Sequence, residues 1–368
     1  MKHRLSPLQL LPPPINTSWV AASNGPNRVS IQRDHGDPVH LPLPLFWYDP
    51  AWYQVTAEQA DSLAVAVAEM DVLVACLRSE VSGPSSDSII HAGRTIDGEA
   101  KIQHRYNRLV PYRNERYGFS ITDLDDAAIV DLRIVVSRDI TGRFAYRPAQ
   151  IQRWETTLTM APVAGGGSIP AATFPPDVVS IEHIASKISQ LRCMAASAAI
   201  FVSIDPYRID DELPGLVKAK PDGLILRLGE LSVDGLQLVE ILCRTRQRLD
   251  QCGGEAMPLW VVPGAITADD AVKLIAMGAS AVAVDAWCNE LLEQTESTQS
   301  EDVIAEHSVT VRSHQYDSRW GDFAAQVVGE RIERFRGLFE SLQRIEKKEQ
   351  LASYDPDWAS RLGVRQLC

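Results

Sequence analysis

"PLWVVPGAITADDAVKLIAMGASAVAVDA" (Pro258–Ala286) contains, in order, a strand, a glycine turn, a helix, a glycine stop and a second strand. The apolar runs LWVV and AVAVD are the strands. Between them, Thr267 and Asp270 have the spacing of a capping box, in which the two side chains and two backbone amides exchange hydrogen bonds at a helix start. The segment therefore predicts one complete β/α unit, with Gly264 allowing close approach of the backbone to a ligand.

Units of the same kind precede this one along the chain. Helices are predicted to begin near Thr56, which has Gln59 in capping-box register, near Ser180 and near Val233. Together with the two strands above, six further apolar runs bring the number of strand candidates to about eight: 44–50, 71–77, 127–136, 156–163, 199–204 and 222–228. No G-x-G-x-x-G follows the first run, so the pattern favours a (β/α)8 barrel of the TIM type over a doubly wound sheet.

The segments that flank this alternation have a different character. Residues 1–42 are rich in proline, asparagine and aspartate and are expected to form an irregular N-terminal arm. Residues 43–295 are assigned to the barrel. Residues 296–368 are expected to form a helical extension packed on the barrel, because apolar residues recur at helical spacing from Phe323 to Leu342.

Composition limits the possible partners. The chain of 368 residues has 36 Lys and Arg against 48 Asp and Glu, a formal net charge of −12, so nucleic-acid binding is not expected. None of the six cysteines is part of a CxxC pair, so we expect neither a metal site nor an iron–sulfur cluster. No apolar run is long enough to cross a membrane, and the N-terminal run is too short for a signal peptide. We therefore expect a cytoplasmic protein with reduced thiols.

In a barrel, chemistry takes place where the strands end. The residues that follow the predicted strands carry both charges and include no nucleophile–base pair, so no catalytic residue is assigned. These residues are Asp49, Arg78, Ser137, Arg138, Asp205, Gly229, Glu230, Pro263, Gly264, Asp285 and Trp287. For the stretch Arg78–Glu80, a role in a site and a structural ion pair are equal alternatives. The helix that begins at Ala268 points its free amides toward the same edge and could bind a phosphate. The alternative is a tight turn without a ligand, since Asp270 and Asp285 would oppose a phosphate.

The order of segments from about Leu43 to Leu342 resembles the FMN-binding (β/α)8 domain of glutamate synthase. Three stretches carry this resemblance: "FPPDVVSIEHIASKISQLR" (Phe174–Arg192), "NERYGFSITDLDDAAIVDLRI" (Asn114–Ile134) and the segment quoted first. The resemblance implies FMN, and an oxidoreductase that acts on CH–NH2 groups and forms glutamate from 2-oxoglutarate. The residues that it places around FMN are Gly264, Ala265, Ile266, Asp285, Ala286, Ser203, Arg133 and Gly229.

Several positions depart from the pattern of that family. Ser203 stands where the resemblance implies a flavin-contacting lysine, Asp139 replaces a second lysine, Pro263 replaces the first glycine of the phosphate turn, and Thr267 replaces an arginine. Arg133 keeps its basic character. No cysteine triplet accompanies Cys288, so the family's iron–sulfur cluster is not expected. These departures make FMN binding doubtful.

Three hypotheses follow for the function. The first is a divergent barrel without the family's catalysis, acting as a binding or partner subunit. The second is an FMN-dependent oxidoreductase of the glutamate synthase type, and the third is a barrel enzyme that acts on a phosphorylated small molecule. The expected partners are a small anionic ligand at the barrel mouth and a protein partner or a second copy of the chain.

Overall fold

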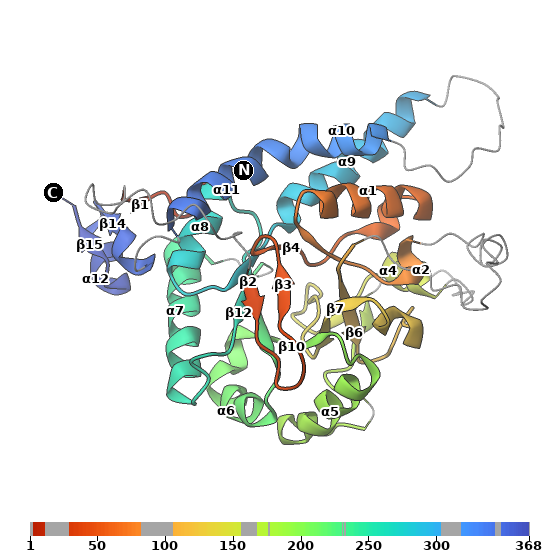
Figure 1. The fold of residues 1–368 in the computed structure, drawn as a ribbon, viewed down its shortest axis with the longest axis horizontal. Coiled ribbons are helices and arrows are strands. Elements are labelled where there is room, and N and C mark those ends of the chain that lie inside the picture. The colour runs from red at the N-terminus through yellow and green to blue at the C-terminus, as the bar shows by residue number, and fades with distance from the viewer. Residues whose placement is uncertain are drawn as a thin grey trace.

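The computed structural model describes residues 3–11, 29–81, 106–155, 168–175, 177–229, 231, 233–302, 318–342 and 347–367. Eight strands form a closed barrel in the order β4, β5, β6, β7, β10, β11, β12, β13, and every neighbouring pair is parallel. Helices surround it (Figure 1). The predicted (β/α)8 barrel is confirmed.

The barrel strands are β4 (Leu45–Trp47), β5 (Leu73–Ala75), β6 (Arg108–Arg113), β7 (Ala127–Arg133), β10 (Ala199–Ile204), β11 (Gly223–Arg227), β12 (Leu259–Val262) and β13 (Ala281–Ala283). The helices are α1 (Ala57–Glu69), α2 (Arg78–Val81), α4 (Pro148–Trp154), α5 (Ile184–Met194), α6 (Ile209–Ala219), α7 (Gly235–Gln251), α8 (Ala268–Ala276), α9 (Asp285–Asp302), α10 (Ser318–Ala324), α11 (Glu330–Leu342) and α12 (Pro356–Leu362). Outside the barrel lie β1 (Leu8–Leu10), β2 (Val29–Ile31), β3 (Val39–Leu41), β8 (Ala145–Tyr146), β9 (Ile169–Pro170), β14 (Leu351–Ser353) and β15 (Arg365–Gln366). Short 3₁₀ turns occupy Trp52–Gln54, Ile121–Leu124, Ile181–His183, Pro206–Arg208 and Lys347–Gln350.

One barrel strand differs from the expectation. The predicted run 156–163 lies outside the described residues, and the barrel closes without it. The third strand is instead β6, whose sequence RLVPYR escapes a hydropathy pattern because arginine stands at both ends and proline in the middle. Both arginines are buried, at 0% and 4% exposure. Tertiary contacts with buried carboxylates, rather than hydropathy, make this segment a strand.

Two of the predicted helix starts have the expected capping boxes. Thr56 accepts from the backbone amide of Gln59 at the start of α1, and Thr267 accepts from that of Asp270 at the start of α8. At Ser180 the helix opens with a 3₁₀ turn before α5 begins, and the helix expected near Val233 begins at Gly235 with Asp234 as its N-cap.

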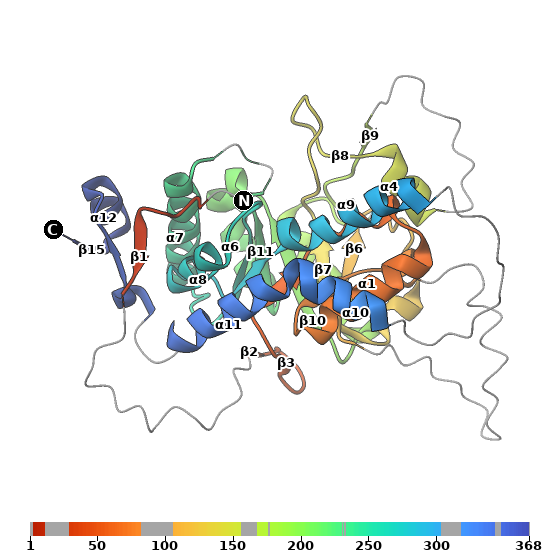
Figure 2. The ribbon, with the colours of Figure 1, turned by 90° about the horizontal axis from the view of Figure 1, so that it is seen from above.

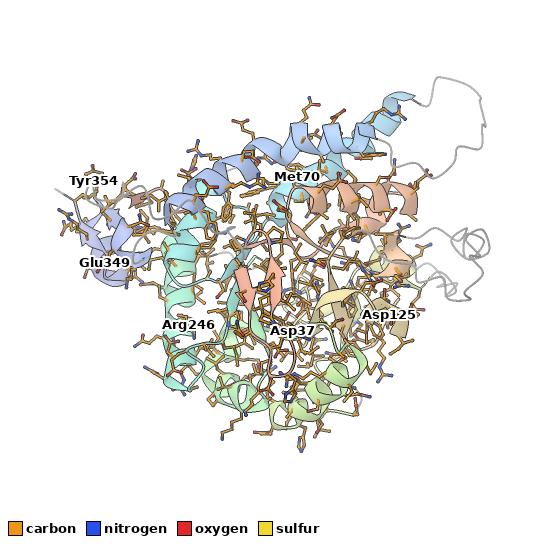
Figure 3. The ribbon with its side chains drawn as sticks, viewed as in Figure 1. Asp37, Met70, Asp125, Arg246, Glu349 and Tyr354 are labelled. Atoms are coloured by element: carbon orange, nitrogen blue, oxygen red, sulfur yellow. The ribbon has the colours of Figure 1, made fainter. Side chains whose placement is uncertain are left out.

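The N-terminal arm is more regular than expected. Its strands β2 and β3 form an antiparallel hairpin at the amino ends of the barrel strands, where Ile31 and Leu41 join the apolar core inside the barrel. Figure 3 labels Asp37 in the loop of this hairpin, in front of the barrel. Strand β1 instead pairs with β14 from the C-terminal region.

The C-terminal region contains the expected long helix. Helix α10 continues through a π-helical turn (Ala325–Gly329) into α11, and this helix packs against α1 and α8. The region also contains β14, α12 and β15, which form a small module with β1. Helix α9 runs to Asp302, so the boundary expected after residue 295 falls inside a helix. No helix in the described part of the chain combines the length and apolar character needed to cross a bilayer.

The two ends of the barrel differ in the segments that lie beside them. Figure 2 shows the β2–β3 hairpin below the barrel, while β8 and β9, which belong to the connection after β7, lie above it. The upper end carries the carboxyl ends of the strands. It is called the mouth from here on.

Candidate functional site at the barrel mouth

Strand alternation decides which side chains point into the mouth. Alternate residues of a strand face the barrel interior, and in β6 and β11 these positions include the buried Leu109 and Ile225. The same parity places Arg113 at the end of β6 and Arg227 at the end of β11. Equivalent positions on β4, β7, β10 and β13 and just beyond them are occupied by Tyr48, Asp131, Arg133, Ser203 and Asp285.

A hydrogen-bonded chain crosses the mouth from β4 to β7. The hydroxyl of Ser203 donates to Asp131 Oδ1 at 2.7 Å and lies 2.6 Å from the phenol oxygen of Tyr48. Because the carboxylate can only accept, Ser203 is the donor to Asp131 and Tyr48 is the donor to Ser203. Burial raises the pKa of Tyr48 above its usual range, which keeps the phenol protonated. All three side chains are fully buried.

Arg133 connects this chain to the edge of the mouth. Its guanidinium donates to Asp131 Oδ2 at 2.9 Å, to Asp49 Oδ1 at 3.0 Å and to the carbonyl of Tyr48 at 2.6 Å. It also lies 4.2 Å from the centre of the Tyr48 ring. Burial alone would lower the pKa of Arg133, but the surrounding acidic groups raise it, so the guanidinium stays charged. Arg133 is thus committed to protein partners.

Arg227 also lies near the ring of Tyr48. Its guanidinium carbon is 5.2 Å from the ring centre of Tyr48, and its Nη2 is 3.9 Å from Asp49 Oδ2. Burial would raise the pKa of Asp49, but Arg133 and Arg227 outweigh it and lower the pKa below its usual range. The side chain of Asp49 is 33% exposed, whereas that of Asp131 is fully buried.

Arg113 has a different environment. Its side chain is 5% exposed, its guanidinium carbon lies 3.6 Å from the ring centre of Trp154 in α4, and its Nη2 is 3.6 Å from Glu80 Oε1 in α2. Its Nη1 is buried and has no hydrogen-bond partner in the described part of the chain. A buried guanidinium nitrogen without an acceptor costs free energy, so an acceptor atom of a ligand at this nitrogen would be stabilising.

Asp285 holds the segment that follows β4. Its Oδ1 accepts from the backbone amides of Tyr48 at 2.9 Å and Asp49 at 2.7 Å. Burial raises the pKa of Asp285 to about 6, although the two amides favour the charged form and oppose this rise. The carboxyl group therefore changes its charge close to neutral pH.

The glycine turn after β12 is tightly packed. Gly264 has φ of +78°, and a Cβ built on it would lie 3.0 Å from the Cα of Gly229 in the loop after β11. Ile266 is fully buried, and its carbonyl accepts from the indole nitrogen of Trp287 at 2.7 Å. Only a residue without a side chain fits at position 264, because two backbones meet there.

The N-terminal arm contacts this turn from outside. Arg4 donates through its guanidinium to the carbonyls of Pro263 and Val233, each at 2.7 Å. The backbone amides of Arg4 and Leu5 donate to the buried carboxylate of Asp270, at 3.1 and 3.2 Å. The carboxylate of Asp270 in the first turn of α8 therefore already has hydrogen-bond partners within this chain.

The predicted site residues therefore fall into two groups. Arg133, Ser203 and Asp285 lie around Tyr48 and Asp49, with Ala286 next to Asp285 in the first turn of α9. Gly229, Gly264, Ala265 and Ile266 make up the turn after β12 and its contact with the loop after β11. No bound ligand tests either group, so their binding roles stay predictions.

The sequence analysis missed Arg113, Tyr48 and Asp131. It considered residues that follow the predicted strands, whereas these three lie inside strands or at their ends. The signal that could have found them is the parity of each strand, for example Asp131 and Arg133, which share the face of the buried Ile129.

Other candidates are used structurally. Arg78 pairs with Asp126 at 3.0 Å, Arg138 pairs with Asp205, and Asp123 caps the 3₁₀ turn that precedes β7. The glycine run 165–167, whose sequence favours a flexible loop over an anion-binding loop, lies outside the described residues. Within the described ranges there is no group of three His, Cys, Asp or Glu side chains arranged to bind a metal.

The residues present do not fit FMN in the manner that the resemblance implies. Ser203 supplies a hydroxyl, already used by Tyr48 and Asp131, where a cation is needed. The charge of Arg133 is balanced by Asp131 and Asp49. At the turn, Pro263 has no amide hydrogen, and the amide and hydroxyl of Thr267 are both used in the cap with Asp270.

Comparisons with known proteins leave the family of this chain unassigned. Neither a family model nor a curated protein matches this chain. Among solved structures, a mandelate oxidase variant with (S)-mandelic acid has 12% identity and a TM-score of 0.49, with 91% of this chain and 83% of that chain covered. A putative lactate oxidase from Pediococcus acidilactici has 12% identity and a TM-score of 0.47, covering 90% and 80%. Likeness at this level assigns neither a family nor a function to this chain.

Proposed function

We propose that this protein binds a small organic anion at the barrel mouth, with a carboxylate of the ligand accepting from Arg113. The observation that carries this proposal is the buried Nη1 of Arg113, which has no acceptor among the described residues. A carboxylate oxygen would supply a charge-assisted hydrogen bond at that nitrogen. Arg133, in contrast, already donates to three acceptors and contributes mainly its charge.

The acids around the mouth restrict the charge of the ligand. Asp49, Asp131, Glu80 and Asp285 offset the three arginines, so each additional negative charge on a ligand meets repulsion. A monocarboxylate is therefore favoured over a doubly charged phosphate. This balance supports the hypothesis of a binding protein over that of an enzyme acting on a phosphorylated molecule.

Catalysis by the glutamate synthase route is not part of this proposal. The mouth lacks the cation that the resemblance requires at Ser203, and the residues after β12 provide fewer donors than that family's turn. We infer a divergent barrel that keeps the fold and binds an anion, either for its own regulation or as a subunit of a larger assembly.

The test is calorimetric titration of the purified chain with propionate, malonate, inorganic phosphate and FMN at constant ionic strength. We expect saturable binding of propionate, which Arg113→Met abolishes because the donor is lost. Arg113→Lys keeps the positive charge but lacks the planar set of guanidinium donors, so it should bind propionate more weakly than the wild type. Arg244→Met, which removes an exposed arginine on α7 paired with Asp210, is the control and should bind as the wild type does.

Each other result selects a different function. Phosphate binding tighter than propionate binding would favour the enzyme acting on a phosphorylated molecule. FMN binding with flavin absorbance would favour the oxidoreductase. Absence of binding by all four probes would overturn the proposal and leave the protein-partner hypothesis.

A further inference from the structure

Arg113 is held by two side chains that belong to different loops. The ring of Trp154 in α4 lies 3.6 Å from its guanidinium carbon, and the carboxylate of Glu80 in α2 lies beside its Nη2. Glu80 and Trp154 also contact one another directly. The three side chains therefore form one unit, drawn from the connections after β5 and β7 and from the end of β6.

The carboxylate of Glu80 is fixed by bonds that do not involve Arg113. Its Oε2 accepts from the backbone amide of Leu77 at 2.7 Å, and its Oε1 accepts from the indole nitrogen of Trp154 at 2.5 Å. Its distance to Arg113 Nη2, 3.6 Å, is too long for a hydrogen bond. Glu80 is 3% exposed. Glu80 therefore anchors Trp154 through a hydrogen bond, and it balances the charge of Arg113 without a hydrogen bond to it.

Trp154 is in turn held from its other side. Tyr117 stacks on it with ring centres 6.4 Å apart and an angle of 20° between the planes. Tyr146 meets it edge-on at 5.4 Å, and Gly118 approaches it so closely that a Cβ there would lie 2.9 Å from the Cβ of Trp154. The indole cannot turn away from Arg113 without disturbing these contacts.

We propose that Glu80 and Trp154 are positioning residues, which orient Arg113 so that its Nη1 faces the ligand. The ring of Trp154 fixes the plane of the guanidinium, and Glu80 fixes the ring. This inference rests on the proposed anion binding and adds to it the residues that determine its geometry. It also explains why a buried carboxylate, which repels an anionic ligand, lies so close to the binding arginine.

Glu80→Gln separates positioning from charge, because the two effects have opposite signs. Removal of a negative charge alone would tighten propionate binding. If Glu80 acts by positioning, the amide nitrogen of the new side chain faces either the Leu77 amide or the Trp154 indole, two donors meet, and the unit loses its geometry. We expect propionate to bind about fivefold more weakly, as the loss of one such hydrogen bond would cause. Tighter binding would overturn the inference.

Variants of Trp154 provide the second measurement, which remains informative if Glu80→Gln does not fold. Trp154→Phe keeps a ring under the guanidinium and should retain part of the affinity, whereas Trp154→Leu should lose more. Tyr53→Phe is the matched control, because it removes a hydroxyl that accepts from Arg147 at the start of α4 and lies outside the unit of Arg113, Glu80 and Trp154. It should bind propionate as the wild type does.

The outcomes distinguish this inference from the proposed function. Wild-type protein that binds no propionate contradicts the proposed function, and the inference with it. Wild-type binding with equal affinities for Trp154→Phe, Trp154→Leu and Tyr53→Phe contradicts the positioning roles alone. Thermal unfolding of each ligand-free variant, measured in parallel, shows whether affinity changes while the folded state persists.

Discussion

The two ends of the barrel are built on the same alternation and filled with opposite chemistry. At the amino end, Phe46, Phe201 and Trp260 pack together with ring centres 4.6 to 4.7 Å apart, and the β2–β3 hairpin covers them. At the mouth, the next inward positions are Tyr48 after Phe46, Ser203 after Phe201 and Arg227 after Ile225. Two residues further along these three strands, hydrogen bonds and ion pairs thus replace apolar contacts.

This difference assigns separate tasks to the two ends. Apolar burial is non-directional and stabilises the closed barrel, whereas buried ion pairs contribute little net stability after their desolvation but fix geometry. Variants of the lower end should therefore change stability without changing ligand affinity. Variants inside the mouth should do the reverse.

The largest expected effect is at the lower end. Phe201→Ala removes a fully buried ring between Trp260 and Gly223, and should lower the free energy of unfolding by about 3–5 kcal/mol. Urea unfolding measures the change, and Phe201→Leu should cost less. The affinity for propionate of the folded fraction should stay as in the wild type. A large loss of affinity in the folded protein would show that the two ends are coupled.

Gly264→Ala tests the rim of the mouth. Its φ of +78° disfavours any side chain, and the new Cβ would lie 3.0 Å from Gly229, so we expect a loss of about 2 kcal/mol in unfolding free energy. Gly142→Ala is a matched control, because it has φ of +81° but open space around its Cβ. It isolates the backbone strain. Equal effects of the two changes would show that the contact with Gly229 contributes nothing.

Thr267→Ala removes the cap of α8. The hydroxyl of Thr267 accepts from the amide of Asp270 at 3.2 Å, and its loss should cost about 1 kcal/mol. Thr267→Ser should restore most of this stability. Because the N-terminal arm also bonds Asp270, the first sign of the change should be faster hydrogen exchange at the amides of Arg4 and Leu5. Unaltered exchange at both amides would show that loss of the cap does not affect the contacts of the N-terminal arm with Asp270.

The smallest expected effect is a pH dependence at the mouth. The pKa of Asp285, about 6, means that the carboxyl is neutral below this pH and charged above it. Binding of an anion should therefore tighten as pH falls from 7.5 to 5.5, by about fivefold for one nearby charge in a partly solvated site. Methanesulfonate is a suitable probe because it stays ionised throughout. Asp285→Asn should bind with the tighter affinity at both pH values, and a pH dependence that survives this change would assign the effect to another group.

The sequence predicted those elements whose own residues carry the signal. The unit from Pro258 to Ala286 contains apolar runs, a capping box and a glycine stop, and the structure has β12, α8 and β13 there. Asp285 was placed near the mouth by its position after an apolar strand, whereas Arg133 and Ser203 were placed there by the resemblance to the glutamate synthase domain. Strand β6 was missed because the charges of Arg108 and Arg113 hide it, and Arg113 was missed with it.

The sequence by itself determined the alternation of strands and helices, the caps that start α1 and α8, and the end of the barrel at which polar groups gather. Those features depend on the spacing of residues that are close together in the chain. Only the tertiary structure decided that Arg113 lies between Trp154 and Glu80, that Tyr48 reaches Ser203 across the barrel, and that the N-terminal arm bonds the start of α8. These contacts join residues far apart in the chain, and a buried charge reveals its role only when its partners are known.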